Sequence, residues 1–144
     1  MQDFPDTETA RKVLSRGKEA IPELITCLTD TRKTKRPVFQ YWSQTTVSDI
    51  AFIFLTDLFT DSTWKHPTVN GIPSWASIQA ESPDQPAEQA WRSYIAKHST
   101  KYVQEVWQEI WKENESRIYW DDSERCFRVK YSISRLSINL HITH

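Results

Sequence analysis

Residues 47–59 carry the sequence VSDIAFIFLTDLF, which decides the fold more than any other stretch of the chain. Apolar side chains recur there at the spacing of one helix face, and further apolar side chains flank that face. The face holds Val47, Ile50, Ala51, Leu55, Leu58 and Phe59, and the flanks hold Phe52, Ile53 and Phe54. Because a helix that is hydrophobic nearly all round is normally buried, we expect a central helix, capped by Thr45 or Thr46.

Two shorter helices are expected on the N-terminal side of this segment. Residues 7–16 have apolar side chains at helical spacing and are followed by Gly17, a residue type that commonly ends helices. Residues 19–29 show the same spacing, and Pro22 falls in their first turn, where its missing N–H costs little. Residues 31–37 carry four cations and end in proline, which predicts a loop.

The segment from Leu14 to Asp30, LSRGKEAIPELITCLTD, resembles a HEAT-type helical repeat. In that family a Gly-x-x-Ala-[Ile/Val]-Pro-x-Leu run joins one helix to its antiparallel partner. Residues 47–55 are similar to the opening helix of a following repeat, so the resemblance covers residues 8–59. It departs from the family pattern because 16 residues separate Asp30 from Val47 and no second Ala-Ile-Pro-x-Leu run follows. The resemblance implies a small antiparallel helical domain with a binding or scaffolding role.

Residues 60–115 are expected to supply the rest of the helical core. Residues 60–85 are punctuated by prolines, which predicts a long ordered loop with a short helical turn at about residues 75–79. Residues 86–115 keep a 3.6-residue apolar phase, which predicts one long amphipathic helix or a pair of helices broken near Ser99.

The hydrophobic period changes near the C-terminus. Residues 117–131 form two apolar runs separated by a polar turn, which predicts a β-hairpin, and residues 132–144 are expected to be a strand or an extended tail. The fold class expected for residues 1–144 is therefore a single, mainly α domain, HEAT-like and antiparallel, with a C-terminal β-hairpin.

Composition excludes several classes of function. The chain has 144 residues but only 2 glycines, which rules out a glycine-rich phosphate loop. The 2 cysteines and 4 histidines show no metal-ligand spacing, so we expect no metal and no cofactor. No catalytic motif is present, which makes an enzyme the less favoured class of function. No apolar run approaches the roughly 20 residues that span a bilayer. We therefore expect a soluble protein, cytoplasmic if the N-terminus is native.

Aromatic and acidic side chains in the middle of the chain are the main functional signal. The formal net charge is -1, but residues 37–90 hold one cation and six acidic side chains. Three of the 7 tryptophans lie on the apolar stripe of residues 86–115, whereas others lie in loops, where they pin the loop or anchor a partner. The candidate binding residues of this region are Tyr41, Trp42, Trp64, Trp75, Asp57 and Asp61. The leading hypothesis is a non-enzymatic protein–protein interaction domain that binds a partner through these aromatic and acidic loops, of a size and composition that suit a small bacterial inhibitor or immunity-type protein.

Two other functions stay open at this point. Asp57 and Asp61 are spaced i, i+4, as two carboxyl groups of a ligand-binding or hydrolytic site could be. Such a site requires that both face one aromatic cleft and that their surroundings give them different pKa values. The cations Arg32, Lys33, Lys35 and Arg36, followed by aromatic residues, match a weak nucleic-acid site, although the near-neutral charge of the chain disfavours nucleic acid as its partner. Asp49, inside an apolar run, is expected to be a buried anchor that bonds a neighbouring loop.

Overall fold

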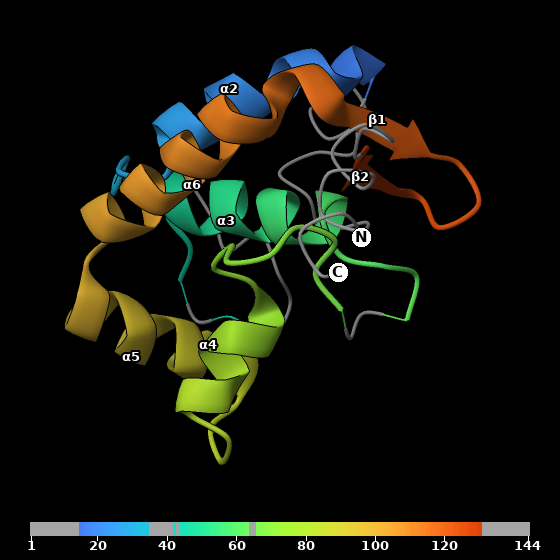
Figure 1. The fold of residues 1–144 in the computed structure, drawn as a ribbon. Coiled ribbons are helices and arrows are strands. Elements are labelled where there is room, and N and C mark those ends of the chain that lie inside the picture. The colour runs from blue at the N-terminus through green and yellow to red at the C-terminus, as the bar shows by residue number, and fades with distance from the viewer. Residues whose placement is uncertain (1–14, 35–41, 43, 64–65, 131–144) are drawn as a thin grey trace, which may run out of the picture.

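The computed structural model describes residues 15–34, 42, 44–63 and 66–130. This part of the chain is mainly helical and ends in a two-stranded antiparallel sheet, as the sequence predicted (Figure 1). Its elements are the 3-10 helix η1 (Gly17–Glu19), α2 (Ala20–Cys27), α3 (Val47–Leu58), α4 (Trp75–Glu81), α5 (Ala87–His98), α6 (Thr100–Asn114), the 3-10 helix η2 (Glu115–Arg117), β1 (Ile118–Asp121) and β2 (Cys126–Val129).

Helix α3 is the centre of the core. Thr46 rather than Thr45 caps it: its hydroxyl accepts a hydrogen bond from the Asp49 N–H, and the Asp49 carboxylate accepts one from the Thr46 N–H. Phe52 and Leu55 are completely buried, which is what the apolar flanks of this helix require. Helices α2 and α6 lie side by side over α3, while α4 and α5 pack together on the other side of it (Figure 1).

The N-terminal helices begin and end close to the positions that the sequence indicates. Gly17 has a φ of +58°, a left-handed conformation that glycine adopts without strain. After the short η1 turn, α2 begins at Ala20, so that Pro22 lies in its first turn. The helix expected over residues 7–16 lies outside the described residues except for its last two positions.

Residues 86–115 form a pair of helices. The break is at Ser99, which has φ 75° and ψ 154° and caps α6 by accepting a hydrogen bond from the Tyr102 N–H. Trp91 and Trp107 are buried in the core, and Trp111 is partly buried against it. The preceding loop contains α4, which is longer than the helical turn predicted there.

Strands β1 and β2 form an antiparallel hairpin, which is the last element of the described residues. Its register pairs Ile118 with Val129 and Asp121 with Cys126. Residues 131–144, including the predicted strand or tail, lie outside the described residues. No helix in the ranges given above is both long enough and apolar enough to cross a membrane.

Asp49 joins α3 to α5. The sequence predicted a bond to a neighbouring loop, but one carboxylate oxygen, Oδ1, accepts hydrogen bonds from Trp91 Nε1 and Arg92 Nη1 of α5, both at 2.8 Å. Arg92 also donates to the Gln44 carbonyl at 2.6 Å. The carboxylate is a structural link because these partners and the helix cap occupy both of its oxygens.

Candidate functional site

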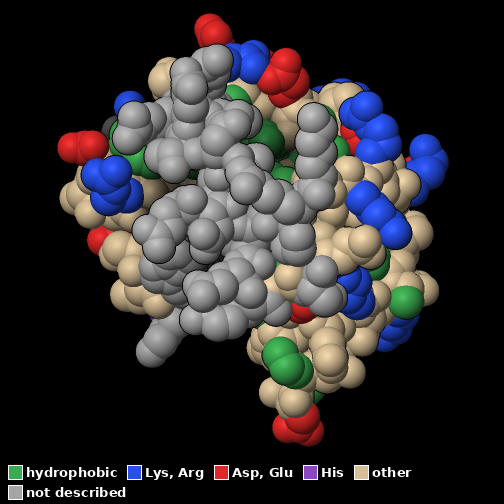
Figure 2. Space-filling view, turned by 180° about the vertical axis from the view of Figure 1, so that it is seen from behind, with side chains coloured by type: hydrophobic (Ala, Val, Ile, Leu, Met, Phe, Trp, Pro, Cys, Tyr) green, Lys and Arg blue, Asp and Glu red, His purple; other side chains and the backbone are tan. Residues whose placement is uncertain are grey.

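The basic loop begins with a paired arginine. Arg32 Nε lies 2.9 Å from Asp30 Oδ1 and Arg32 Nη2 lies 2.6 Å from Asp30 Oδ2, and these bonds lower the pKa of the Asp30 carboxyl. Lys33 forms an isolated β-bridge with Thr46, whereas Lys35 and Arg36 lie outside the described residues. Seen from behind, many of the described Lys and Arg side chains lie along one edge of the molecule (Figure 2).

The candidate tryptophans that the structure describes, Trp42 and Trp75, contact the core, and Trp75 is the first residue of α4. Trp42 and Trp75 meet edge to face with 6.3 Å between ring centroids, and Trp75 packs on Phe52 at 5.1 Å. The Arg92 guanidinium lies 5.4 Å from the centroid of the Trp42 ring. These contacts hold the residues before α3 against α4 and α5, while Tyr41 and Trp64 lie outside the described part of the chain.

Asp57 and Asp61 have different surroundings. Asp57 Oδ1 is buried and has no hydrogen-bond partner, and burial raises the pKa of this carboxyl to about 7. Asp61 accepts hydrogen bonds from Thr63 Oγ1 at 2.6 Å and from the Thr63 N–H, and its Oδ2 lies 3.1 Å from His66 Nδ1. Neither aspartate lines either of the two pockets described below. The described residues also contain no group of three side chains placed to hold a metal ion.

A pocket of about 510 Å³ lies beside the hairpin, and we call it the hairpin pocket. It is lined by Gly17, Lys18, Leu58, Tyr119, Trp120, Arg125 and Phe127. Tyr119 and Trp120 are 43% and 42% exposed, although both are large aromatic residues. The Trp120 ring packs edge-on against Phe127 with 5.0 Å between centroids, so its position is set by the opposite strand.

The charges on the lining of the hairpin pocket are positive. Lys18 Nζ donates a hydrogen bond to the Ile118 carbonyl at 3.0 Å, and Arg125 is exposed, with no ion pair to a described residue. In the hairpin turn Asp121 and Glu124 pair with Arg128, and Asp122 accepts a hydrogen bond from Trp120 Nε1 at 3.4 Å, so among the described residues none of the three forms an ion pair with Lys18 or Arg125. None of the described residues that line the pocket is acidic.

A second pocket, of about 420 Å³, lies between the loop before α4 and the two helices α5 and α6, and we call it the tyrosine pocket. It is lined by Pro67, Gly71, Ile72, Pro73, Ser74, Ala76, Ser77, Tyr94 and Tyr102. None of these described residues is charged, so the chemistry of the tyrosine pocket differs from that of the hairpin pocket.

Comparisons with protein-family models, with curated proteins and with solved structures find no match. The two pockets are therefore the features of the molecule from which we infer a function. Sequence reasoning missed both, although one signal pointed to the first: a two-stranded hairpin buries little of its outer face, so adjacent aromatic residues at 119 and 120 have few places to be covered.

Proposed function

We propose that this chain is a non-enzymatic interaction domain that binds a partner protein in the hairpin pocket. The observation that carries the proposal is the pair of exposed aromatic residues, Tyr119 and Trp120, beside a pocket whose described lining residues include two cations and no acid. An inhibitor or immunity-type protein would act through a surface of this kind.

The aromatic residues favour a protein partner. Tyrosine, tryptophan and arginine are the residue types that contribute most binding energy in protein interfaces, and all three line this pocket. Trp120 is held by Phe127 and by a weak 3.4 Å hydrogen bond from its Nε1 to Asp122, so little side-chain freedom is lost when a partner binds.

The charges indicate the chemistry of the partner. Because Arg125 has no acidic partner among the described residues, a carboxylate brought next to it gains a charge-assisted hydrogen bond without breaking one. Leu58 and Phe127 line the same pocket and suit an apolar side chain. The favoured occupant is thus a segment of another protein in which an aromatic or aliphatic residue adjoins Asp or Glu.

The hydrolytic alternative has less support. Two carboxylates that share acid–base work need to face the same reacting atoms. Asp61 is bonded to Thr63 and His66, while Asp57 on α3 is not among the described residues that line either pocket.

Selection from a random 12-residue peptide library displayed on phage tests the proposal. The full chain should enrich peptides that combine Asp or Glu with Leu, Ile, Phe or Trp. Tyr119→Ala and Arg125→Glu should each weaken a selected peptide roughly 10-fold, the usual effect of losing one anchoring residue. Binding to the native chain should also weaken as salt is added, because the carboxylate contact is exposed.

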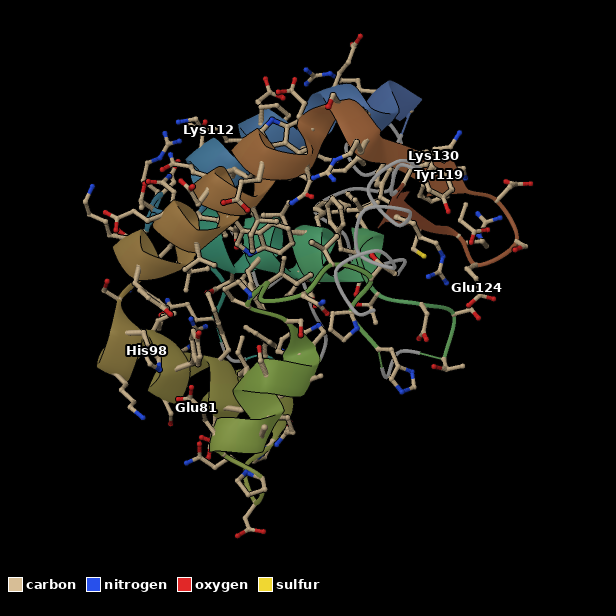
Figure 3. The ribbon with its side chains drawn as sticks, viewed as in Figure 1. Glu81, His98, Lys112, Tyr119, Glu124 and Lys130 are labelled. Atoms are coloured by element: carbon tan, nitrogen blue, oxygen red, sulfur yellow. The ribbon has the colours of Figure 1, made fainter. Side chains whose placement is uncertain are left out.

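Two matched variants serve as controls. Tyr102→Ala removes an aromatic residue that is also 43% exposed, and Lys112→Glu reverses an exposed charge on α6, away from Tyr119 (Figure 3). Both should bind the selected peptides as the native chain does. Selected peptides without acidic residues, or equal binding by Arg125→Glu, would show the proposal to be wrong.

A further inference from the structure

The hairpin has an outer edge along β1, and its turn is directed away from the helices (Figure 1). The Lys130 N–H donates to the Arg117 carbonyl at 2.8 Å, so these two residues form a hydrogen-bonded pair next to the ladder of β1 and β2. Such pairs alternate with non-bonded pairs along antiparallel strands. Ile118 and Trp120 therefore belong to non-bonded pairs, and their backbone N–H and C=O groups point away from β2, toward the edge.

Trp120 is the open position on this edge. At Ile118 the N–H closes the preceding 3-10 turn, and the C=O accepts a hydrogen bond from Lys18 Nζ at 3.0 Å. The backbone N–H and C=O of Trp120 bond to no described residue. The edge of β2 differs, because the outward-pointing Phe127 carbonyl accepts a hydrogen bond from Thr68 Oγ1 at 2.5 Å. Trp120 thus offers one backbone donor and one backbone acceptor to a partner.

The hairpin pocket lies along the edge of β1. Side chains of neighbouring strand residues point to opposite faces of a sheet, yet Tyr119 and Trp120 both line this pocket. Lys18, which bonds the outward carbonyl of Ile118, lines it as well. A pocket that contacts both faces of β1 and a residue bound at its edge reaches around that edge. A chain segment seated in the pocket therefore runs beside β1.

We infer that the partner segment binds in an extended conformation and adds to the hairpin as a third strand beside β1. The inference rests on the proposed function, and it names the conformation in which the partner is recognised. An unpaired sheet edge is a template for a further strand, and strand addition is a recurring mode of peptide recognition. One residue of the segment, opposite Trp120, exchanges two backbone hydrogen bonds with it.

The side chains around this edge fit such a strand. The rings of Trp120 and Phe127 meet edge-on on one face of β1, with 5.0 Å between centroids, and suit an apolar side chain of the segment. Lys18 is bound at the first residue of β1, and Arg125 directly precedes β2 at the turn end of the hairpin. The two cations therefore lie toward opposite ends of β1. A short segment in which an apolar residue lies between acidic residues matches this arrangement.

A scan of backbone N-methylation tests the added strand. A peptide selected on the full chain is synthesised with one N-methyl group at each position in turn, and its affinity is measured by fluorescence anisotropy. The N–H groups of a bound strand point alternately toward β1 and away from it. N-methylation should therefore weaken binding at alternate positions only, by about 10-fold or more opposite Trp120, where it removes a hydrogen bond and places a methyl group between the strands. Alanine substitution at the same positions is the control for side-chain contacts.

The backbone amide of Trp120 gives a second measurement, on the chain itself. When the peptide saturates the chain, the NMR chemical shift of the Trp120 N–H should become less dependent on temperature, because this amide gains a hydrogen bond. The N–H of Tyr119 faces β2 in both states, so it is the internal control and should keep its temperature dependence.

The outcomes distinguish the added strand from the proposed function. Equal losses on N-methylation at consecutive positions, or a Trp120 N–H that keeps its temperature dependence in the complex, would overturn the added strand and leave the proposed function standing. Absence of any enriched peptide, or selected peptides whose binding Tyr119→Ala does not weaken, would overturn both.

Discussion

The carboxyl group of Asp57 is the most perturbed acid in the described chain. Its Oδ1 is buried without a hydrogen-bond partner, and loss of hydration raises its pKa to about 7. In an unfolded chain the same group titrates near pH 3.9. The folded state therefore binds an additional proton between about pH 4 and pH 7, and stability falls as the pH rises through that range.

The substitution Asp57→Asn tests this residue. Titration of Asp57 should make the native chain about 2 to 3 kcal/mol less stable at about pH 8 than at about pH 5, because about two pH units of that range lie below the folded-state pKa and each contributes about 1.4 kcal/mol. Asn carries no titrating proton, so the variant should lack this pH dependence and be the more stable chain at the higher pH. Urea unfolding at both pH values measures the difference. Parallel pH profiles for the two chains would mean that Asp57 is ionised in the folded state.

At the scale of elements, the break between α5 and α6 depends on one residue. Ser99 has φ 75° and ψ 154°, a region that residues with a β-carbon rarely adopt. Its hydroxyl offsets part of the strain by capping α6 at the Tyr102 N–H. His98 and Tyr102, which lie on either side of this break, stack with 5.2 Å between their ring centroids.

Ser99→Gly and Ser99→Ala should shift stability in opposite directions. Glycine relieves strain worth about 1 to 3 kcal/mol and loses a few tenths from the cap, so Ser99→Gly should stabilise the chain by about 1 kcal/mol. Alanine keeps the strain and loses the cap, so Ser99→Ala should destabilise it by about 1 kcal/mol. Thermal unfolding of the three chains gives the comparison, and a lower midpoint for Ser99→Gly would contradict it.

At the scale of the whole molecule, Asp49 connects segments that are far apart in the chain. It caps α3 and bonds Trp91 and Arg92 of α5, and Arg92 also contacts Trp42 and the Gln44 carbonyl. Phe52 stacks on Trp91 with 4.1 Å between centroids, so apolar and polar contacts join the same two helices.

Loss of the Asp49 carboxylate should therefore be costly. Asp49→Ala leaves the buried Trp91 N–H and one arm of the partly exposed Arg92 without this partner, which should lower the free energy of unfolding by about 3 kcal/mol. Trp91→Phe is the matched change, because it removes one donor and keeps an aromatic ring against Phe52, and it should cost less than Asp49→Ala. Urea unfolding ranks the two. If Asp49→Ala lowered the free energy of unfolding no more than Trp91→Phe does, the bond between Asp49 and Arg92 would contribute nothing to stability.

Local spacing in the sequence was enough to predict most of the elements. The apolar run at residues 47–59 indicated a buried helix, and the 3.6-residue apolar period of residues 86–115 indicated a long helix or a helix pair. Two apolar runs separated by a polar turn indicated the hairpin. These patterns work because helix and strand periods are properties of the backbone and recur every few residues.

The partners of individual side chains depended on the tertiary structure. Asp49 meets Arg92 across 43 positions of the chain, and the hairpin pocket joins Lys18 to residues more than 100 positions away. Two equally exposed tyrosines, Tyr102 and Tyr119, belong to different pockets, one uncharged and one cationic. The sequence by itself determined which faces are apolar. Only the packing of those faces decided which polar and aromatic groups meet, because side-chain contacts between distant segments follow from the fold as a whole and have no period along the chain.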